Sequence, residues 1–546
     1  MERLASVLVV CVVTLLSSLP VSAQQTETFI GQPKKLMIDA TPPVEVDVLE
    51  TPEGTYPLKP VLPWQHLPPG TQIEVPGHKQ DGVIIVPDPG KVKVLPKAVP
   101  QIFQSPVPGT TGPQRTLAIL TRYSNPVVLP YTQAQWVVRV AGEVNAWLQR
   151  TSYGQTWLTG LTDETPDVTP WLTIASTNGT CTVADSFTWA NQAKAAAVLT
   201  GYDPSAYDRV LIALPANLHC NWLGQALLGG PTIWFNGTVS TQTIVHEFGH
   251  SFFLRHSQGY DCRPDILDES CTIKDVGDLL DVMGRPLPDE TGSNGLSPYN
   301  SVQRDRLGWF DDVRQTIGVI TSSGVYHLDP YTSPGAGIKA WKVHHPTAIS
   351  PESWYYVQMH QPVGDDAYLE EYADLTAGVQ VHVTNPTEAT TIFWLDMHPE
   401  TTSWRDAALV PGERYDDPGG TLAVRVLEAD ATGARIAVIR AEDTLSLQLL
   451  TPWQDTLHHG DTLRIELRVL IGTQPAAGAL WEWGFTIPHD PTLYRPPDET
   501  LGPDGIWRFE HTLTPDLPPG LYTIYARVSW EDQQTDIVSA QLTLQP

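Results

Sequence analysis

Residues 246–256 read HEFGHSFFLRH, and this stretch decides how the middle of the chain is interpreted. An α-helix turns about 100° per residue, so side chains four positions apart share one face. His246 and His250 therefore present their imidazoles to one point, and two imidazoles on one helix make a good half-shell for zinc. Glu247 lies one step along, where its carboxylate can take a proton from a metal-bound water. The spacing predicts a metal-binding helix that begins near Ser240.

Histidines on an ordinary amphipathic helix are the alternative interpretation of this stretch. Ile244, Phe248 and Phe252 recur at helical spacing and form an apolar stripe of their own, away from the two histidines. His256 needs a separate argument, because a helix continued six residues past His250 would point it away from the metal. His256 can reach the metal if the chain turns after Phe252.

The pattern HExxHxxFxxH over residues 246–256 resembles the long zinc signature of the metzincin peptidases. In that signature a glycine at the place of Phe253 allows the turn by adopting a positive φ. Phe253 departs from the signature. Either the turn is made with ordinary dihedral angles and His256 is the third ligand, which is the favoured interpretation, or another residue such as Asp261 supplies it.

The second half of the signature follows at Asp281-Val282-Met283-Gly284, which resembles the Met-turn that forms an apolar floor under the zinc histidines. Ordinary core packing is the alternative role for Met283. Stretches at 151–154, 277–284, 300–309 and 395–409 narrow the resemblance to gametolysin-type metallopeptidases, over roughly residues 116–440. The resemblance implies one catalytic Zn²⁺ and an endopeptidase that acts on extracellular or cell-wall glycoproteins.

Three further features near the histidines suggest roles in catalysis, substrate binding and calcium binding. Tyr299 follows Met283, where some metzincins place a tyrosine that stabilises the tetrahedral intermediate; a loop aromatic is the favoured alternative. Residues 222–234 predict an irregular edge strand to which an extended substrate can add through backbone hydrogen bonds. Acidic side chains crowd the stretch from His256 to Met283, at Asp261, Asp265, Asp268, Glu269, Asp275, Asp278 and Asp281. They can hold Ca²⁺, although a solvated acidic loop is the better interpretation.

The bulk composition bounds the class of protein. At 546 residues the chain is too long for one hydrophobic core, and 41% hydrophobic with 17% charged residues indicates a folded protein. The formal net charge of −28 repels phosphate backbones, so nucleic acid is excluded as an expected partner. The expected partner is instead an extracellular protein or glycoprotein substrate.

The N-terminus predicts export. Residues 1–23 have a short charged start, an apolar run and small residues at a cleavage site, as a signal peptide does, and no later stretch is long enough to cross a membrane. An uncleaved anchor is the alternative. Removal of residues 1–23 leaves four cysteines, which suggests two disulfides in a secreted protein. We expect Cys181–Cys220 and Cys262–Cys271, because both loops are then local.

The remaining pattern predicts a multidomain protein. Residues 24–115 form a Pro-rich segment, either a propeptide or a small β module, with a linker. Alternating strands and helices over 116–315 predict an α/β, metzincin-like catalytic domain. Short strands separated by turns predict a β-sandwich domain at 316–440 and an immunoglobulin-like sandwich at 441–546.

The sequence therefore leads to two functional hypotheses. The favoured one is hydrolysis of peptide bonds, with His246, His250 and His256 as metal ligands and Glu247 as general base. The alternative is a catalytically silent adhesion or carbohydrate-binding protein on the same scaffold, and Phe253 is the main reason to consider it.

Overall fold

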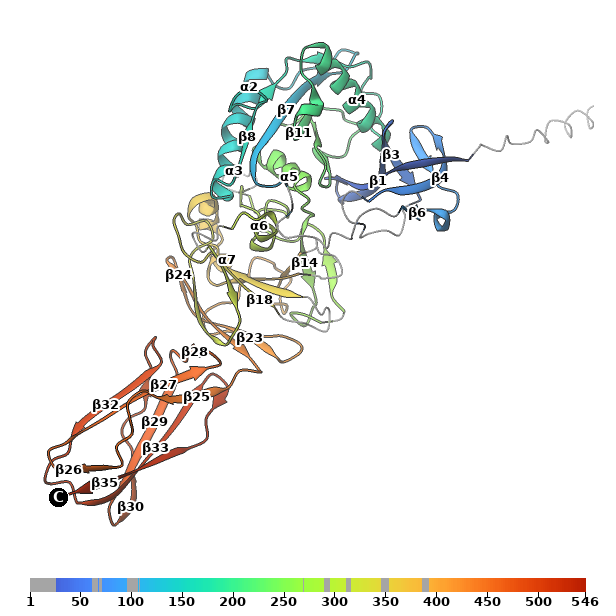
Figure 1. The fold of residues 1–546 in the computed structure, drawn as a ribbon. Helices are drawn as coiled ribbons and strands as arrows, with labels where there is room; N and C mark the ends of the chain where they lie inside the picture. The colour runs from blue at the N-terminus through green and yellow to red at the C-terminus, as the bar shows by residue number, and fades with distance from the viewer. Residues whose placement is uncertain are drawn as a thin grey trace, which may run out of the picture. The chain divides into compact units, whose positions relative to one another are not determined.

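The computed structural model describes residues 26–60, 67, 71–95, 107, 109–268, 270–288, 295–310, 316–344, 353–384 and 392–546 (Figure 1). Strands far outnumber helices among these residues, and the prediction of a multidomain chain with few helices is confirmed. The predicted signal peptide lies outside the described residues. None of the helices in the described ranges has the length and apolar character needed to cross a membrane.

The chain divides into two compact units that cut across the predicted catalytic segment 116–315. The first unit comprises residues 1–104, 115–137 and 160–239, and the second comprises 105–114, 138–159 and 240–546. Each unit therefore contains part of the segment, and the histidine motif belongs to the second unit.

The first unit is built on one long sheet. Its order is β10 (Leu172–Thr173), β7 (Gly112–Arg122), β11 (Arg209–Leu214), β13 (Thr232–Asn236), β12 (Gly224–Leu227), β1 (Glu27–Ile38), β2 (Val44–Thr51), β3 (Gly54–Lys59), β5 (Val83–Ile85), β4 (Ile73–Gln80) and β6 (Lys93–Val94). The short strand β9 (Asp167–Val168) also pairs with β7. Strands β7, β11 and β13 run parallel, whereas β12 runs antiparallel to β13.

Helix α4 (Val183–Leu199) supplies the main helical cover of this sheet. Thr182 caps it with a reciprocal capping box, in which the Thr182 side chain and the Asp185 side chain each bind the other's backbone N–H. Its alanines and aromatic residues share a hydrophobic core with the central strands. The shorter helical segments of this unit are α2 (Gln133–Val137), η1 (Pro89–Lys91) and η3 (Pro204–Ala206).

The second unit contains the helices around the histidine motif. They are the π-helical segment η2 (Val138–Val144), α3 (Asn145–Thr151), α5 (Thr241–Ser251), α6 (Ser301–Leu307), η4 (Gly364–Glu371) and α7 (Ala373–Thr376). Strand β8 (Thr156–Thr159) follows α3. The predicted helical stripe Trp136, Val140, Val144, Trp147 and Leu148 is buried throughout.

A second sheet follows the histidine motif and crosses the predicted domain boundary at residue 316. Its order is β15 (Thr272–Lys274), β14 (Ser257–Asp261), β21 (Ile392–Leu395), β20 (Gln380–Thr384), β19 (Trp354–Gln358), β18 (Ala340–His344) and β16 (Ile317–Ile320). Strand β14 begins directly after His256 and pairs in parallel with β21. The strand that follows the third histidine is therefore part of the same sheet as β16, β18, β19, β20 and β21.

The two faces of this sheet differ in chemistry. One face shares a hydrophobic core with the sheet β17 (Gly324–Leu328), β24 (Gly433–Arg440), β23 (Leu422–Asp430) and β22 (Arg414–Asp416). The opposite face carries buried polar side chains, namely Ser257, Gln358, Gln380 and His382. Side chains alternate along a strand, so the register of these strands separates the apolar set from the polar set.

Residues beyond 440 form two further sheets that share one hydrophobic core. One sheet contains β25 (Leu445–Leu449), β27 (Thr462–Ile471), β28 (Gln474–Pro475) and β32 (Ile506–Thr512). The other contains β26 (Thr456–His458), β35 (Val538–Gln545), β33 (Gly520–Trp530), β29 (Leu480–Ile487), β30 (Asp490–Tyr494), β31 (Glu499–Thr500) and β34 (Gln533–Gln534).

Both disulfides form in the predicted pairing, Cys181–Cys220 and Cys262–Cys271. The first joins two positions of the first unit, and the second closes the loop between β14 and β15. Disulfides of this kind are typical of oxidising compartments.

Candidate metal centre

Helix α5 starts where the sequence predicts it. The side chain of Ser240 caps the helix by accepting a hydrogen bond from the backbone N–H of Thr243, at 3.3 Å. The Thr241 hydroxyl in the first turn accepts from Arg139 at 2.9 Å and donates to Glu143 at 2.7 Å. The preceding helical segment η2 thus holds the start of the helix that carries the histidines.

The helix ends in a Schellman motif that uses Phe253 in the place of glycine. The backbone N–H of Phe253 binds the carbonyl of His250 at 2.9 Å, and that of Leu254 binds the carbonyl of Gly249 at 2.9 Å. Phe253 adopts a φ of 74°, the left-handed conformation that favours glycine. The expectation that a phenylalanine would turn the chain with ordinary dihedral angles is therefore wrong. The side chain at this position differs from the signature, but the backbone conformation does not.

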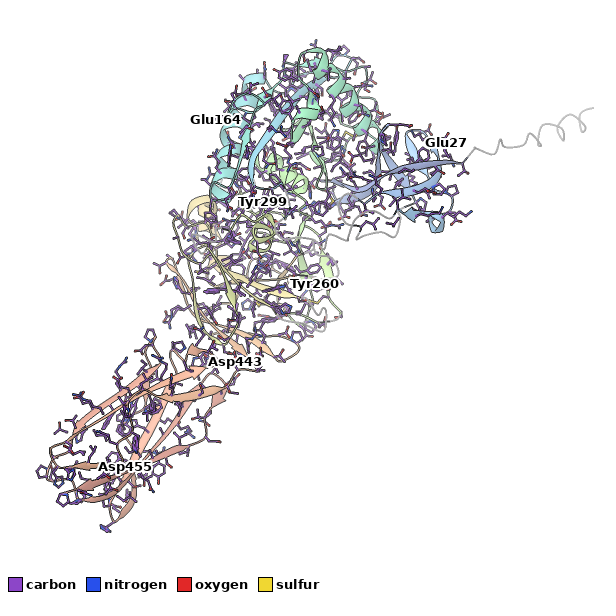
Figure 2. All side chains as sticks on the ribbon, viewed as in Figure 1. Glu27, Glu164, Tyr260, Tyr299, Asp443 and Asp455 are labelled. Carbon is purple, nitrogen blue, oxygen red and sulfur yellow. A yellow bond between two sulfur atoms is a disulfide. The ribbon has the colours of Figure 1, made fainter. Side chains whose placement is uncertain are left out.

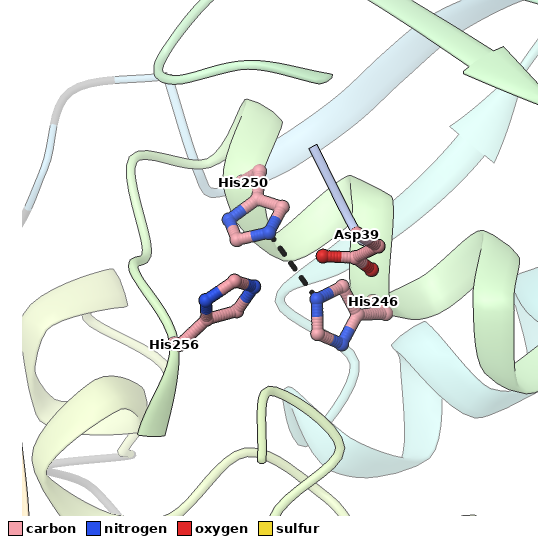
Figure 3. A group of neighbouring side chains, drawn as sticks. All are labelled: Asp39, His246, His250 and His256. Atoms are coloured by element: carbon pink, nitrogen blue, oxygen red, sulfur yellow. Dashed lines mark hydrogen bonds between the residues drawn. The ribbon is translucent and has the colours of Figure 1, made fainter. Parts of the chain in front are cut away.

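This turn brings His256 to the two histidines of α5 (Figure 3). The ring centroid of His256 lies 5.4 Å from that of His246 and 4.9 Å from that of His250. The Nε2 atoms of His246 and His250 are 3.2 Å apart. Two ligands of one tetrahedral zinc ion are separated by about 3.3 Å, given zinc–nitrogen distances of about 2.0–2.1 Å. The arrangement of the three imidazoles fits a zinc ion.

Each imidazole directs its other ring nitrogen to an oxygen. Nδ1 of His246 lies 2.6 Å from the carbonyl oxygen of Val282, and Nδ1 of His250 lies 2.8 Å from that of Leu254. Nδ1 of His256 lies 3.6 Å from a carboxylate oxygen of Asp275. Such partners fix the ring orientation and the tautomer in metal-binding histidines, leaving Nε2 as the ligand atom.

Met283 lies beneath α5 at Gly249. A Cβ atom added to Gly249 would lie 2.3 Å from Sδ of Met283 and 3.2 Å from the ring of Tyr299. Only a residue without a side chain allows this approach. Met283 is fully buried, as expected of an apolar floor under the histidines.

Tyr299 packs against the same helix (labelled in Figure 2). It is fully buried, its hydroxyl donates to the carbonyl of Val245 at 2.6 Å, and its ring contacts Trp147 and Trp309 edgewise or tilted. Burial raises the pKa of this hydroxyl well above its usual range. The geometry supports a packing role for Tyr299 in holding α5.

Two buried carboxylates pin the turn that contains Met283. Asp281 accepts hydrogen bonds from the backbone N–H groups of Met283, at 2.7 Å, and Asn300, at 2.9 Å. Burial and the nearby charge of Asp278 raise the pKa of Asp281. Burial is the largest influence on Asp278 and acts to raise its pKa, but the hydrogen bond and charge interaction with His382, together with the hydrogen bonds from Leu280 and Asn300, outweigh burial and lower the pKa.

The other acidic residues of this stretch have separate partners. Asp261, the alternative third ligand, pairs with Arg263 at 2.8 Å, and this arginine lowers the pKa of Asp261. The carboxylate of Asp268 accepts a hydrogen bond from the backbone N–H of Ser270 at 2.7 Å, and that of Asp275 accepts one from the side-chain amide of Gln258 at 3.2 Å. Glu269 lies outside the described residues. Asp261, Asp268 and Asp275 therefore each have a contact of their own, and a calcium site stays a prediction.

The predicted edge strand at 222–234 forms β12 and β13, but β12 is already paired on its outer side. Strand β1 lies antiparallel to it, with Leu36 opposite Leu227 and Ile38 opposite Gln225. The backbone N–H of Asp39 extends the ladder to the carbonyl of Gly224 at 3.2 Å. The N-terminal segment therefore occupies the position proposed for an extended substrate.

Comparison with known proteins assigns the region around the histidines. Residues 140–327 match the gametolysin peptidase family M11. The predicted resemblance is thereby confirmed, and the match indicates a peptidase of a metallopeptidase family. The gametolysin match contains the histidine motif, the Met283 turn and Tyr299. No curated protein matches the chain.

Three solved structures align weakly with the chain. A β-glucosidase from Listeria innocua in complex with glucose is 16% identical over 19% of this chain, with a TM-score of 0.15, and the chain spans 16% of its length. OgpA from Akkermansia muciniphila is 10% identical over 81% of this chain and 97% of its own, with a TM-score of 0.24. The CARDB domain of PF1109 from Pyrococcus furiosus is 18% identical over 19% and 88%, with a TM-score of 0.14. These scores are too low to indicate a shared fold.

Sequence reasoning missed two residues that shape the site. The role of Gly249 could have been suspected, because the glycine lies between the two histidines on a buried helix. His382 carried no signal, since it reaches Asp278 across 104 positions of sequence. Such a contact depends on the folded sheet and not on any local pattern.

Proposed function

We propose that this chain is a secreted zinc-dependent endopeptidase that hydrolyses extracellular or cell-wall proteins and glycoproteins. The convergence of three imidazoles, two of them oriented by a hydrogen bond between Nδ1 and a backbone carbonyl oxygen and the third lying near Asp275, carries the proposal. The gametolysin match and the two disulfides support it. The turn at Phe253 removes the main reason for the silent-scaffold alternative, because His256 joins the other two histidines despite the substitution.

His246, His250 and His256 would hold the ion, which supplies Lewis acidity and lowers the pKa of a water. Glu247 lies on the same helix and is fully buried, where a carboxylate is an effective proton acceptor. Glu247 takes a proton from the attacking water as its oxygen bonds to the substrate carbonyl carbon. It then gives that proton to the leaving amine as the carbon–nitrogen bond breaks. Met283 and Tyr299 hold the helix and take no part in proton transfer.

The proposal is tested by Glu247→Ala in the purified chain, with hydrolysis of a mixed protein substrate and zinc content measured together. Loss of a general base typically costs about 10²–10⁴-fold in rate. We therefore expect a loss of this size with bound zinc unchanged, and wild-type hydrolysis that a chelator abolishes. Wild-type activity in Glu247→Ala would overturn the mechanism. Bound zinc without hydrolysis in any form of the wild type would favour the silent scaffold.

For the N-terminal segment we propose a latency role, because β1 occupies the outer side of β12. Leu36 is fully buried in the core of the first unit, so Leu36→Asp should release β1 from this edge. Ile30→Asp is the matched control, since Ile30 lies on the same strand, is 50% exposed and does not pair with β12.

The expected result is faster peptide hydrolysis by Leu36→Asp, accompanied by faster hydrogen exchange of the β12 amides, with neither change in Ile30→Asp. The latency role would be refuted if hydrolysis by Leu36→Asp is unchanged or slower although its β12 amides exchange faster. Residues 24–115 would then be a structural β module. Unchanged hydrogen exchange in β11 would show that the rest of the sheet is intact in this variant.

A further inference from the structure

We propose that His382 is a positioning residue for the metal centre: through Asp278 it fixes the strand that begins after His256 and the turn that contains Met283. The inference rests on the proposed metal site. It assigns a role in metal binding to a residue of β20, which lies beyond the gametolysin match.

The contacts from His382 lead in two steps to the candidate ligands. Nε2 of His382 lies 2.9 Å from Oδ2 of Asp278, and both side chains are about 1% exposed. The same carboxylate oxygen accepts from Ser257 Oγ at 3.2 Å and Asn300 Nδ2 at 3.3 Å. Asn300 also donates to Ser257 Oγ at 2.7 Å. Ser257 is the residue next to His256, so this cluster holds the backbone that carries the third imidazole.

The same cluster holds the turn under the histidines. Oδ1 of Asp278 accepts from the backbone N–H of Leu280 at 2.9 Å, and its carbonyl accepts from Arg285 at 2.9 Å. The backbone N–H of Ser257 donates to the carbonyl of Met283 at 2.9 Å. Val282, between these points, supplies the carbonyl that orients the ring of His246. Asp278 therefore holds both the backbone next to His256 and the turn that orients the ring of His246.

Without His382 this carboxylate would be a poorly compensated buried charge. An ionised carboxylate accepts hydrogen bonds and donates none, so Nε2 of His382 must carry the donated proton. Oδ2 of Asp278 has three described donors, and loss of His382 removes the one with the shortest distance. Buried charges stay ordered only when they are well paired, so the turn and the strand are expected to shift.

The experiment measures the zinc affinity of the full chain by competition with a chromophoric chelator. His382→Leu removes the donor, and we expect the zinc dissociation constant to rise about tenfold, as for lost outer partners of metal ligands. His382→Gln keeps an amide donor and should recover most of the affinity. Hydrolysis by zinc-loaded His382→Leu should show a reduced kcat with a nearly unchanged KM.

Tyr355→Phe is the matched control. Tyr355 lies on the neighbouring strand β19, and its hydroxyl also donates to a buried carboxylate, that of Asp417. It belongs to the apolar-core face of the sheet, opposite the face of His382. Tyr355→Phe should lower stability without changing zinc affinity, so it separates general destabilisation from a specific effect on the metal centre.

Two outcomes would overturn the inference: an unchanged zinc affinity in His382→Leu, or an equal loss of affinity in Tyr355→Phe. If His382→Leu does not fold, His382→Phe makes the same test with a ring that donates no hydrogen bond, and unchanged zinc affinity there would also overturn the inference. A wild type that binds no zinc would refute the proposed function itself, which is a distinguishable result.

Discussion

Gly249→Ala tests whether the contact between α5 and the turn at Met283 is as close as the structure shows. The added Cβ would meet Sδ of Met283 at 2.3 Å and Cε at 3.0 Å, where a normal contact needs about 3.5–4.0 Å. Met283 is fully buried, so its side chain has little room to move away. Overpacking of this kind costs about 1–3 kcal/mol.

Helix propensity acts in the opposite direction, because alanine is better than glycine inside a helix by about 0.8–1.0 kcal/mol. We therefore expect a net destabilisation of up to about 2 kcal/mol, together with weaker zinc binding as α5 moves. In the Met283→Ala background only the contact with the Tyr299 ring at 3.2 Å remains, so Gly249→Ala should instead be neutral or stabilise by up to about 1 kcal/mol. Urea unfolding of the four proteins in this double-mutant cycle measures both values. Stabilisation by Gly249→Ala in the wild-type background would refute the packing argument.

Two other predictions follow from named residues. Phe253→Gly suits the left-handed backbone, so zinc affinity should be retained, whereas Phe253→Val should weaken zinc binding and be less stable than Phe253→Gly by about 1–3 kcal/mol in unfolding free energy. Equal behaviour of the two variants in chelator competition and urea unfolding would contradict this reasoning. Arg115 lowers the pKa of Asp208 through a hydrogen bond of 3.0 Å, so their pairing stabilises the fold above the unfolded pKa of aspartate and is lost as pH falls through the lowered value. Arg115→Gln should therefore be slightly less stable than wild type at pH 7 and indistinguishable from it near pH 2, as thermal unfolding across pH would show.

The sequence predicted the parts of the site that follow from local geometry. His246, Glu247 and His250 come from the period of one helix, and the cysteine pairing follows from short loops. Phe253 shows the limit of such reasoning, because the statistical preference of glycine for positive φ is a free-energy bias that surrounding contacts can overcome. The Schellman hydrogen bonds and the packing of the chain on either side impose the turn on this residue.

Contacts between distant segments could not be predicted. The pairing of β14 with β21 joins residues from either side of the boundary placed at 316, and the short apolar runs carry no information about partner or register. The pairing of β1 with β12 could not be predicted either. It joins the N-terminal segment to a sheet whose other strands the sequence placed in the catalytic region. Residue periodicity reports which face of an element is buried, but not which element buries it.

The parallel pairing of β14 with β21 also sets an order of events during synthesis. The strand after His256 cannot be fixed in its sheet until β21 has left the ribosome, on the order of ten seconds later at typical elongation rates. The emerging chain would carry the HEFGH helix throughout that interval without the sheet pairing that follows His256. A peptidase assembled in this way becomes competent late in its own translation, when most of the chain is already made.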